Sequence, residues 1–146
     1  MNAYLVLKDK HQKEVNEFPF FFAFSEEQFN KGMEKFGLKP DETDKICSLG
    51  IASGFLLKTD AERCEQMFAR HEKEMKDAIA ADSTGEGFIF EMFNCELANH
   101  EYVVGRDVDS TLDALGLKPE DIAKDPRLQH GLKLAKKRQI EQLEAE

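Results

Sequence analysis

The chain has little of what builds disulfide-bonded or membrane proteins. Among 146 residues there are three cysteines, two tyrosines and no tryptophan. An odd number of widely spaced cysteines (Cys47, Cys64 and Cys95) is not a disulfide framework, so we expect reduced thiols and a cytoplasmic location. No apolar run approaches the roughly 20 residues of a membrane helix, and the first residues do not resemble a signal peptide. We therefore expect no membrane partner.

Motifs for metal binding and catalysis are also missing. Met75 stands where a zinc-protease helix would carry a second histidine after His71. Four residues from different parts of the chain are weak candidates for a metal site: Cys64, His71, Cys95 and His100. The more ordinary interpretation is a buried histidine with one hydrogen-bond partner. We expect no cofactor and no catalytic residues, although Asn99, His100, Glu101 and Tyr102 sit together at an expected helix end, where polar residues usually cap the helix.

Charge is unbalanced toward acid. The formal net charge is −9, which argues against general binding to nucleic-acid backbones and suits a basic protein partner. Residues 59–101 hold eleven Asp or Glu and four Lys or Arg, so this segment carries −7 of that charge. An acidic helical face can imitate the charge spacing of nucleic acid, whereas the simpler interpretation is an ordinary solvated face. The candidate interaction residues are Glu62, Glu65, Glu72, Asp77 and Glu91.

A basic patch near the end of the chain is partly neutralised. It consists of Lys133, Lys136, Lys137 and Arg138, and Glu141, Glu144 and Glu146 follow it. Basic side chains also suit the C-terminal end of a helix. We expect no direct contact with nucleic acid.

Five of the twelve phenylalanines fall within Phe18–Phe24, the densest apolar run. Pro19 disfavours a helix through this point, and Ser25 begins a capping pattern for the next helix. The run therefore predicts an irregular or extended connector between two helices. Because each buried phenylalanine stabilises by roughly 1.5–3 kcal/mol, we expect it to plug the core. The alternative is an aromatic groove that receives a ligand or partner.

Apolar spacing predicts a mainly α fold: a compact single-domain bundle of about five to seven helices around this connector, with a minor two-stranded β element as an option. One globular domain should cover residues 1–146, with 137–146 as a frayed or projecting helix end. The expected helices are 3–17, 26–36, a short one from Pro40 that carries Ile46, Cys47 and Leu49, then 59–81, 88–100, 109–115 and one from Pro126. The expected strand segments are 55–57 and 102–105.

Four segments together resemble a known group of proteins. They are Phe18–Ser25, Thr84–Ile89, Glu96–Tyr102 and Asp125–Leu128. They are similar to segments of small uncharacterised proteins from bacteriophages and conjugative elements of gut bacteria. That group has no established activity, so the resemblance brings no catalytic residues. It implies an accessory protein of a mobile element, and such proteins often bind and disable host defence machinery.

The sequence supports two functional hypotheses. The first is a non-enzymatic interaction module that binds a host protein, in its sharpest form an anti-CRISPR-type inhibitor that occupies a basic nucleic-acid-binding surface. The alternative is a small-molecule- or metal-binding domain with an aromatic-rich pocket near Cys64, His71 and Cys95. The Ala61–Ala78 seam fits either pairing within the chain or a dimer, so a monomer and a homodimer are both compatible with the sequence.

Overall fold

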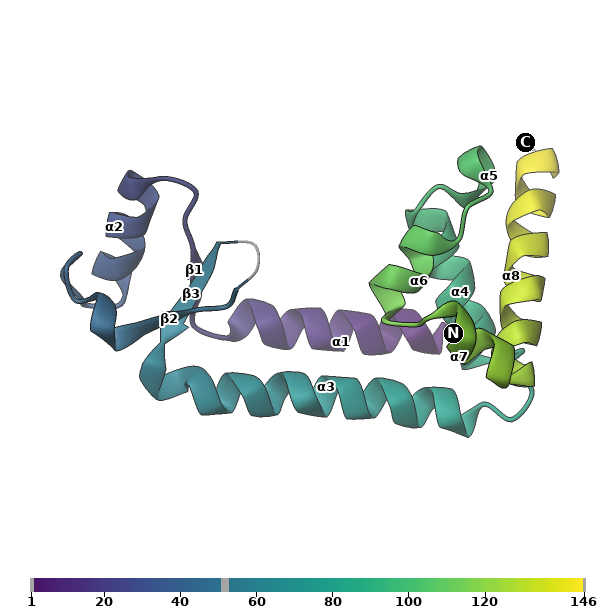
Figure 1. Cartoon of the computed structure of the whole chain (residues 1–146), viewed down its shortest axis with the longest axis horizontal. Coiled ribbons are helices and arrows are strands. Elements are labelled where there is room, and N and C mark those ends of the chain that lie inside the picture. Colours follow the sequence, from purple (N-terminus) through teal and green to yellow (C-terminus); the bar gives the residue numbers. More distant parts are fainter. Residues whose placement is uncertain (1, 51–52, 146) are drawn as a thin grey trace. The chain divides into compact units, whose positions relative to one another are not determined.

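A computed structural model describes residues 2–50 and 53–145. The chain divides into two compact units, one from Met1–Lys10 and Glu74–Glu146, the other from His11–Lys73. We call them unit 1 and unit 2 and describe each by itself. Helices α1 (Ala3–Glu17) and α3 (Ala61–Ala81) contribute residues to both (Figure 1). The predicted mainly α fold with a minor β element is confirmed, whereas the prediction of a single domain remains a prediction.

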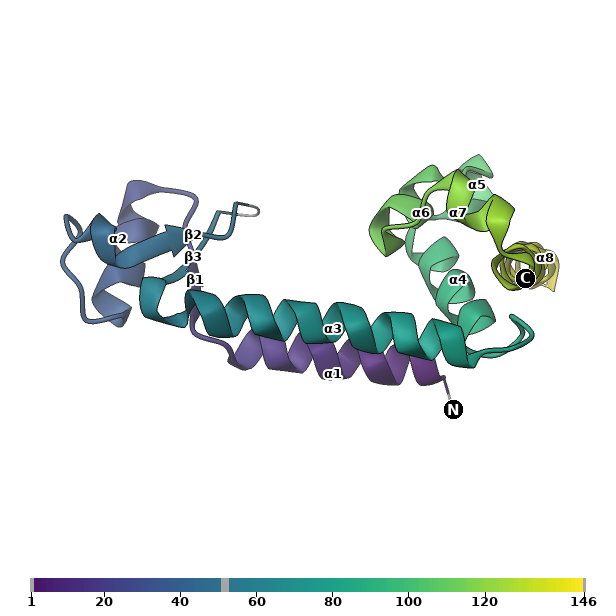
Figure 2. The ribbon, with the colours of Figure 1, turned by 60° about the horizontal axis from the view of Figure 1, so that its bottom comes forward.

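Unit 1 is helical and is built around α4 (Phe88–Asn99). Besides parts of α1 and α3, it contains α5 (Tyr102–Gly105), α6 (Asp109–Leu115), α7 (Pro119–Lys124) and α8 (Pro126–Ala145). Helix α4 lies beside α8 in Figures 1 and 2. Its buried side chains pack with Tyr4 of α1 and with residues of α6 and α8 in one cluster. A helix that is apolar on most sides is central to its unit, as its composition predicts.

The corner between α3 and α4 is fixed by one carboxylate. The N–H groups of Gly85, Gly87 and Ile89 donate to Asp82 over 2.9–3.1 Å. Burial alone would raise the pKa of Asp82, but these hydrogen bonds hold it below its usual value. From α8, Arg127 donates to the backbone oxygen of Asp82 at 2.8 Å. Residues 82–87 therefore form an ordered structural corner.

Unit 2 contains a small antiparallel sheet. Its strands are β1 (Phe20–Phe22), β2 (Ile46–Ser48) and β3 (Gly54–Leu57), in the order β1-β3-β2. Successive side chains point to opposite faces. One face packs on α2 (Glu26–Lys35) through Phe21, Ile46 and Met33, and the other packs on α3 through Phe20, Leu56, Cys64 and Met67.

The ends of α2 follow the sequence signals. The Ser25 side chain accepts from the N–H of Gln28 at 3.2 Å, as an N-cap should. At the other end Gly37 has a φ of 74°, and the N–H of Leu38 reaches the carbonyl oxygen of Met33 at 2.9 Å. This pairing is a glycine-terminated helix end.

Two predicted elements are wrong. The short helix expected from Pro40 is a 3-10 turn, η1 (Thr43–Lys45), followed by β2, because Ile46 and Cys47 face opposite sides of the sheet. The strand expected at 102–105 is α5, a short helix that restarts after Glu101 takes a left-handed φ of 53°. Its expected partner, β3, already has β1 and β2 on its two sides.

The Phe18–Phe24 connector is extended, as predicted, and it contributes an edge strand. Phe20 and Phe21 are buried, on opposite faces of the sheet. Phe22 and Phe24 are 50% and 76% exposed, so the run is only partly a core plug. At the other end of the chain, α8 continues as a helix to Ala145, and Gln139 within it is buried.

Candidate functional site

The first turns of α3 and one face of the sheet enclose an apolar groove in unit 2. Its volume is about 400 Å³. We call it the Cys64 groove. The short turn η2 (Lys58–Asp60) leads from β3 directly into α3 and brings the helix over this face. The lining residues are Cys47, Ser48, Leu49, Leu56, Ala61, Cys64, Glu65 and Phe68.

Two thiols and one aromatic ring give the Cys64 groove its character. Cys64 is buried and Cys47 is half-buried, and both are free thiols. Burial raises the pKa of the Cys64 thiol, and the nearby Cys47 adds to the effect. A neutral, buried thiol is a poor nucleophile and behaves as an apolar lining group. Phe68 remains 43% exposed, with its ring 6.5 Å from that of Phe20.

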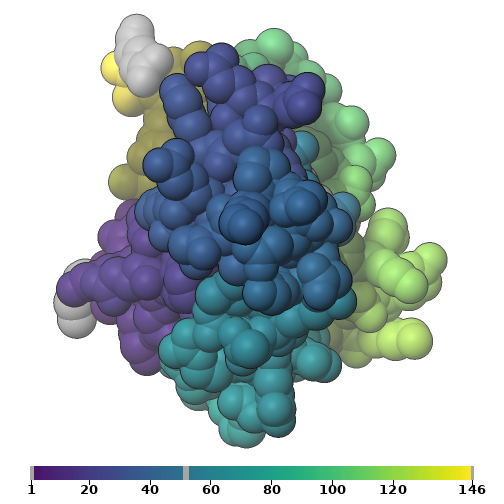
Figure 3. Space-filling view, turned by 90° about the vertical axis from the view of Figure 1, so that its left-hand side faces the viewer, coloured from purple at the N-terminus to yellow at the C-terminus, as the bar shows by residue number. Residues whose placement is uncertain are grey.

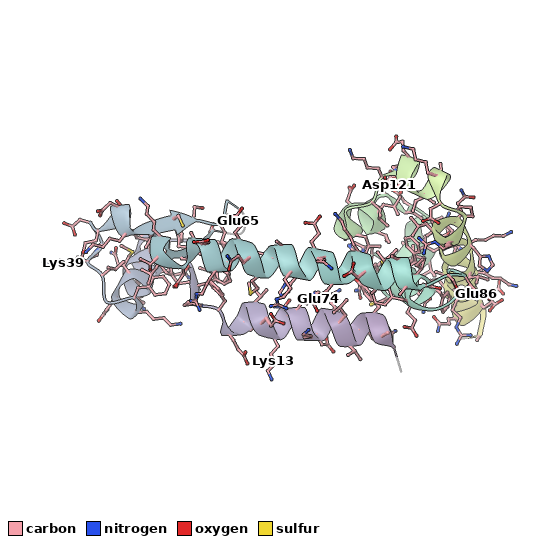
Figure 4. The ribbon with its side chains drawn as sticks, turned by 90° about the horizontal axis from the view of Figure 1, so that it is seen from below. Lys13, Lys39, Glu65, Glu74, Glu86 and Asp121 are labelled. Atoms are coloured by element: carbon pink, nitrogen blue, oxygen red, sulfur yellow. The ribbon has the colours of Figure 1, made fainter. Side chains whose placement is uncertain are left out.

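Two of the five predicted interaction residues lie at or beside this groove. Glu65, labelled in Figure 4, lines the groove. Glu62 is also exposed and lies one helical turn before Glu65 on α3. Glu72 is exposed further along the same helix. The acidic segment therefore does place carboxylates beside an apolar hollow.

The other two predicted interaction residues belong to unit 1. Asp77 borders a hollow of about 460 Å³ that is also lined by Val6, Leu7 and Phe88. Glu91 accepts a hydrogen bond from the N–H of Ala3 at 2.8 Å, so this carboxylate holds the start of α1. Glu91 therefore has a structural contact that its sequence position did not reveal.

His71, one of the metal candidates, takes part in an ion-pair cluster of unit 2. Its Nε2 lies 3.2 Å from Glu14, which also pairs with Arg70. Hydrogen bonds from Arg70 and then His71 lower the pKa of Glu14 to about 2. The His71 ring stacks on His11 with centroids 3.9 Å apart. These contacts join α1 to α3, so the Ala61–Ala78 seam has a contact within the chain at His71.

Cys95 and His100 lie in unit 1, beside a buried carboxylate. Glu96 accepts from Asn99 at 2.6 Å, from Tyr4 at 3.0 Å and from Lys8 at 3.1 Å. Burial alone would raise the pKa of Glu96, but these three donors hold it below its usual value. No motif marks Glu96 in the sequence, and only its place within an apolar helix distinguishes it from the other acidic residues.

The remaining polar groups at the end of α4 cap the helix. His100 Nδ1 lies 2.8 Å from the backbone oxygen of Glu96, one turn earlier. Burial raises the pKa of the Cys95 thiol, which keeps it protonated. Asn99 donates to the side chain of Glu96, while Tyr102 packs against the core cluster of unit 1. This arrangement provides no base beside a nucleophile.

Within residues 2–50 and 53–145, no three His, Cys, Asp or Glu side chains are grouped so that they could hold a metal ion. Cys64 contacts the sheet cluster, His71 contacts Glu14, and Cys95 and His100 belong to unit 1. In the same part of the chain, every helix is too short or too polar to cross a membrane.

Comparison with known proteins gives a family and no activity. No curated protein and no solved structure was found to be similar to this chain. A family model described as a family of unknown function (DUF7659) matches residues 3–138. The match covers most of the sequence, both units included. The chain therefore belongs to this family of unknown function.

Proposed function

We propose that the protein is a non-enzymatic interaction module that binds a basic, nucleic-acid-binding partner through the Cys64 groove. The observation that carries the proposal is the exposed ring of Phe68 at an apolar groove lined by Glu65. Stable interfaces combine an apolar centre with a polar rim, and aromatic side chains often supply much of the binding energy.

The groove favours one kind of contact. An aliphatic or aromatic side chain of the partner fills the space between Phe68 and the sheet, while Lys or Arg beside it pairs with Glu62 and Glu65. The net charge of −9 accelerates the encounter with a basic surface, and salt weakens that effect. A partner that uses the same basic surface for nucleic acid would then lose its nucleic acid.

The biological context rests on the resemblance of four segments to proteins of bacteriophages and conjugative elements. In that context the partner is a host protein, and inhibition of a defence nuclease or its guide complex is the sharpest form of the proposal. Glu65 in the lining of the Cys64 groove and Glu62 beside it support the charge of the partner, and the resemblance alone supports its role.

The test is site-specific photo-cross-linking in host lysate. A photoreactive residue at Phe68 should capture a basic protein, and the same residue at Lys39, an exposed position of unit 2 outside the groove, should not. The captured protein is then purified and bound to labelled DNA or RNA. Addition of the wild-type chain should release the nucleic acid, and Glu62→Lys with Glu65→Lys should not. Equal capture at both positions, or a partner that keeps its nucleic acid, would overturn the proposal.

A second candidate function is small-molecule binding in the same groove. Its volume of about 400 Å³ lies within the roughly 300–1,000 Å³ of typical ligand pockets. Native mass spectrometry of freshly purified protein, with metal content read from the same sample, separates the two functions. A mass above that of the bare chain in wild type, with the added mass absent in Leu56→Phe, would favour small-molecule binding. The mass of the bare chain in wild type would favour the interaction with a partner protein.

A further inference from the structure

Strand β1 is an edge of the sheet in unit 2, and its backbone pattern can be deduced. The N–H of Ala23 donates to Ser53 at 3.1 Å, and the register pairs Phe21 with Phe55 and Phe22 with Gly54. In an antiparallel pair, alternate residues direct their polar groups toward the neighbouring strand. Phe21 and Ala23 therefore face β3, and Phe20 and Phe22 direct theirs the other way.

The hydrogen bond between β3 and β2, on the other side of β3, agrees with this alternation. The N–H of Leu49, at the end of β2, donates to the carbonyl oxygen of Gly54 at 2.9 Å. Gly54 therefore directs its carbonyl toward β2, which leaves Phe55 to pair with Phe21. The N–H of Phe20 turns back to Phe18 at 2.8 Å. The N–H and C=O of Phe22 and the C=O of Phe20 are thus directed to the open edge.

A groove of about 470 Å³ runs between this strand and α2. The strand contributes Phe20, Phe21 and Phe22, and the helix contributes Gln28, Lys31, Gly32 and Lys35, which recur at helical spacing on one face. Figure 3 views unit 2 from the α2 side. A Cβ built on Gly32 would lie 2.1 Å from the Phe21 ring, so this glycine allows the helix to pack closely on the strand.

The ionic side chains on this groove are basic. Lys31 and Lys35 line it, while the acidic residues of α2 (Glu26, Glu27 and Glu34) do not. Lys31 lies 3.3 Å from Glu27, but both side chains are more than 70% exposed, so this pair is weak and easily exchanged. Phe22 is 50% exposed beside the lysines.

We propose that an extended acidic segment of a partner protein adds to β1 as a fourth strand. Its backbone hydrogen-bonds to Phe22 and Phe20, and carboxylates on one of its faces pair with Lys31 and Lys35. Strand addition takes affinity from main-chain hydrogen bonds and specificity from alternate side chains. The site is separate from the Cys64 groove, which lies on the α3 face of the sheet, and its ligand has the opposite charge.

The probe is a display library of random octapeptides, selected on the full-length protein. Peptides with Asp or Glu at alternate positions and no proline between them should be enriched. A synthetic peptide of the enriched sequence should bind Lys31→Glu with Lys35→Glu at least about tenfold more weakly by fluorescence anisotropy, a difference of about 1.4 kcal/mol. Lys13→Glu, a charge reversal at an exposed position of α1 in the same unit, is the control and should bind like wild type.

A backbone variant tests strand addition itself. Phe22→Pro removes the outward N–H and keeps the bonds of Phe21 to β3, whereas Phe22→Ala removes the ring and keeps the N–H. Phe22→Pro should lose the peptide and Phe22→Ala should retain most of the binding. In wild type, bound peptide should slow hydrogen exchange at the Phe22 amide. Slow exchange at Phe21 in each variant shows that the sheet is intact.

Three results would overturn the proposal. One is selection of no peptide, or of basic peptides. Another is equal binding by Phe22→Pro and wild type. The third is a wild-type dimer that Phe22→Pro converts to a monomer, because a second copy of the chain would then cover the edge.

Discussion

The two units solve the problem of burial differently. Unit 1 has one continuous cluster around α4, where Ile89, Phe93 and Leu97 have no exposed surface. Unit 2 has two smaller clusters on opposite faces of a sheet whose strands are three or four residues long. A small sheet leaves edges and large side chains uncovered, and the exposed phenylalanines of the described chain (Phe22, Phe24 and Phe68) are all in unit 2. Unit 1 therefore has the larger continuous core, and unit 2 has the exposed aromatic rings on which the proposed contacts depend.

The largest effect should come from the centre of unit 1. Phe93→Ala removes a fully buried ring and should lower the free energy of unfolding by about 3–5 kcal/mol. Urea unfolding measured by circular dichroism tests the magnitude. Because α1 and α3 supply residues to both units, we expect one transition, with hydrogen exchange accelerated in both. Two separate transitions, with unit 2 unaffected, would show that the units fold independently.

Removal of the buried carboxylate in unit 1 should have the next largest effect. Glu96→Ala leaves the Tyr4 hydroxyl, which is buried, without its acceptor. An unsatisfied buried hydroxyl costs about 1–3 kcal/mol. Urea unfolding of this variant should be compared with Glu144→Ala, an exposed acidic position on α8 that should be nearly neutral. Equal stability of the two variants would contradict a structural role for the Glu96 network.

The same carboxylate should make stability depend on pH. The pKa of Glu96 is lower in the folded protein than its usual value. Its contribution is therefore fully present above the ordinary glutamate pKa, about 4.3, and is lost as the pH falls through the depressed folded value. The stability difference between wild type and Glu96→Gln should be largest at pH 7 and should shrink toward pH 3. A difference that grows with acid would reverse the sign of the argument.

A substitution at Gly32, with a smaller expected effect on stability, tests the close packing of α2 on β1 in unit 2. Gly32→Ala places a methyl group against Phe21 and should cost about 1–2 kcal/mol, because overpacking outweighs the higher helix propensity of alanine. The double variant with Phe21→Leu should recover part of this loss, which a double-mutant cycle measures. A stabilised Gly32→Ala protein would show that α2 does not pack closely on β1.

The sequence predicted the helices well because their signals are local. Ser25, Gly37 and Leu38 mark the ends of α2, and the apolar spacing of α3 and α4 marks their buried faces. Local signals did not predict the correct element where one sequence motif occurs twice. Gly-Leu-Lys-Pro-acid-acid begins at Gly37 and again at Gly116, but only the second copy leads into an α-helix of its own, α7.

The two copies differ in the segments that come after their prolines. In both copies the acid three residues after the lysine accepts from the lysine N–H at 2.9 Å, Glu42 from Lys39 and Asp121 from Lys118. After Pro119, helix α7 begins. After Pro40, the chain reaches Ile46–Ser48, which pairs with β3. Pairing between distant strands overrides the local helix signal here.

The candidate site was harder to predict because it is assembled from separated segments. The Cys64 groove combines residues from β2, β3 and α3, and the acidic count of residues 59–101 pointed only to its rim. The same count overstated the free charge. Glu91, Glu96 and Asp82 all accept hydrogen bonds inside unit 1. Composition cannot separate a solvated carboxylate from one that the fold uses.

The smallest expected change in stability is at the proposed contact surface. Phe68→Ala removes a ring that is 43% exposed, so it should change the free energy of unfolding by no more than about 1 kcal/mol. If unit 2 supplies the contact surface, the same variant should weaken binding of the cross-linked partner at least about tenfold. Phe93→Ala, assayed at a temperature where it remains folded, should be much less stable than wild type but should bind the partner with wild-type affinity. A Phe68→Ala protein that is as destabilised as Phe93→Ala would place this ring in the core and would remove the distinction between the two units.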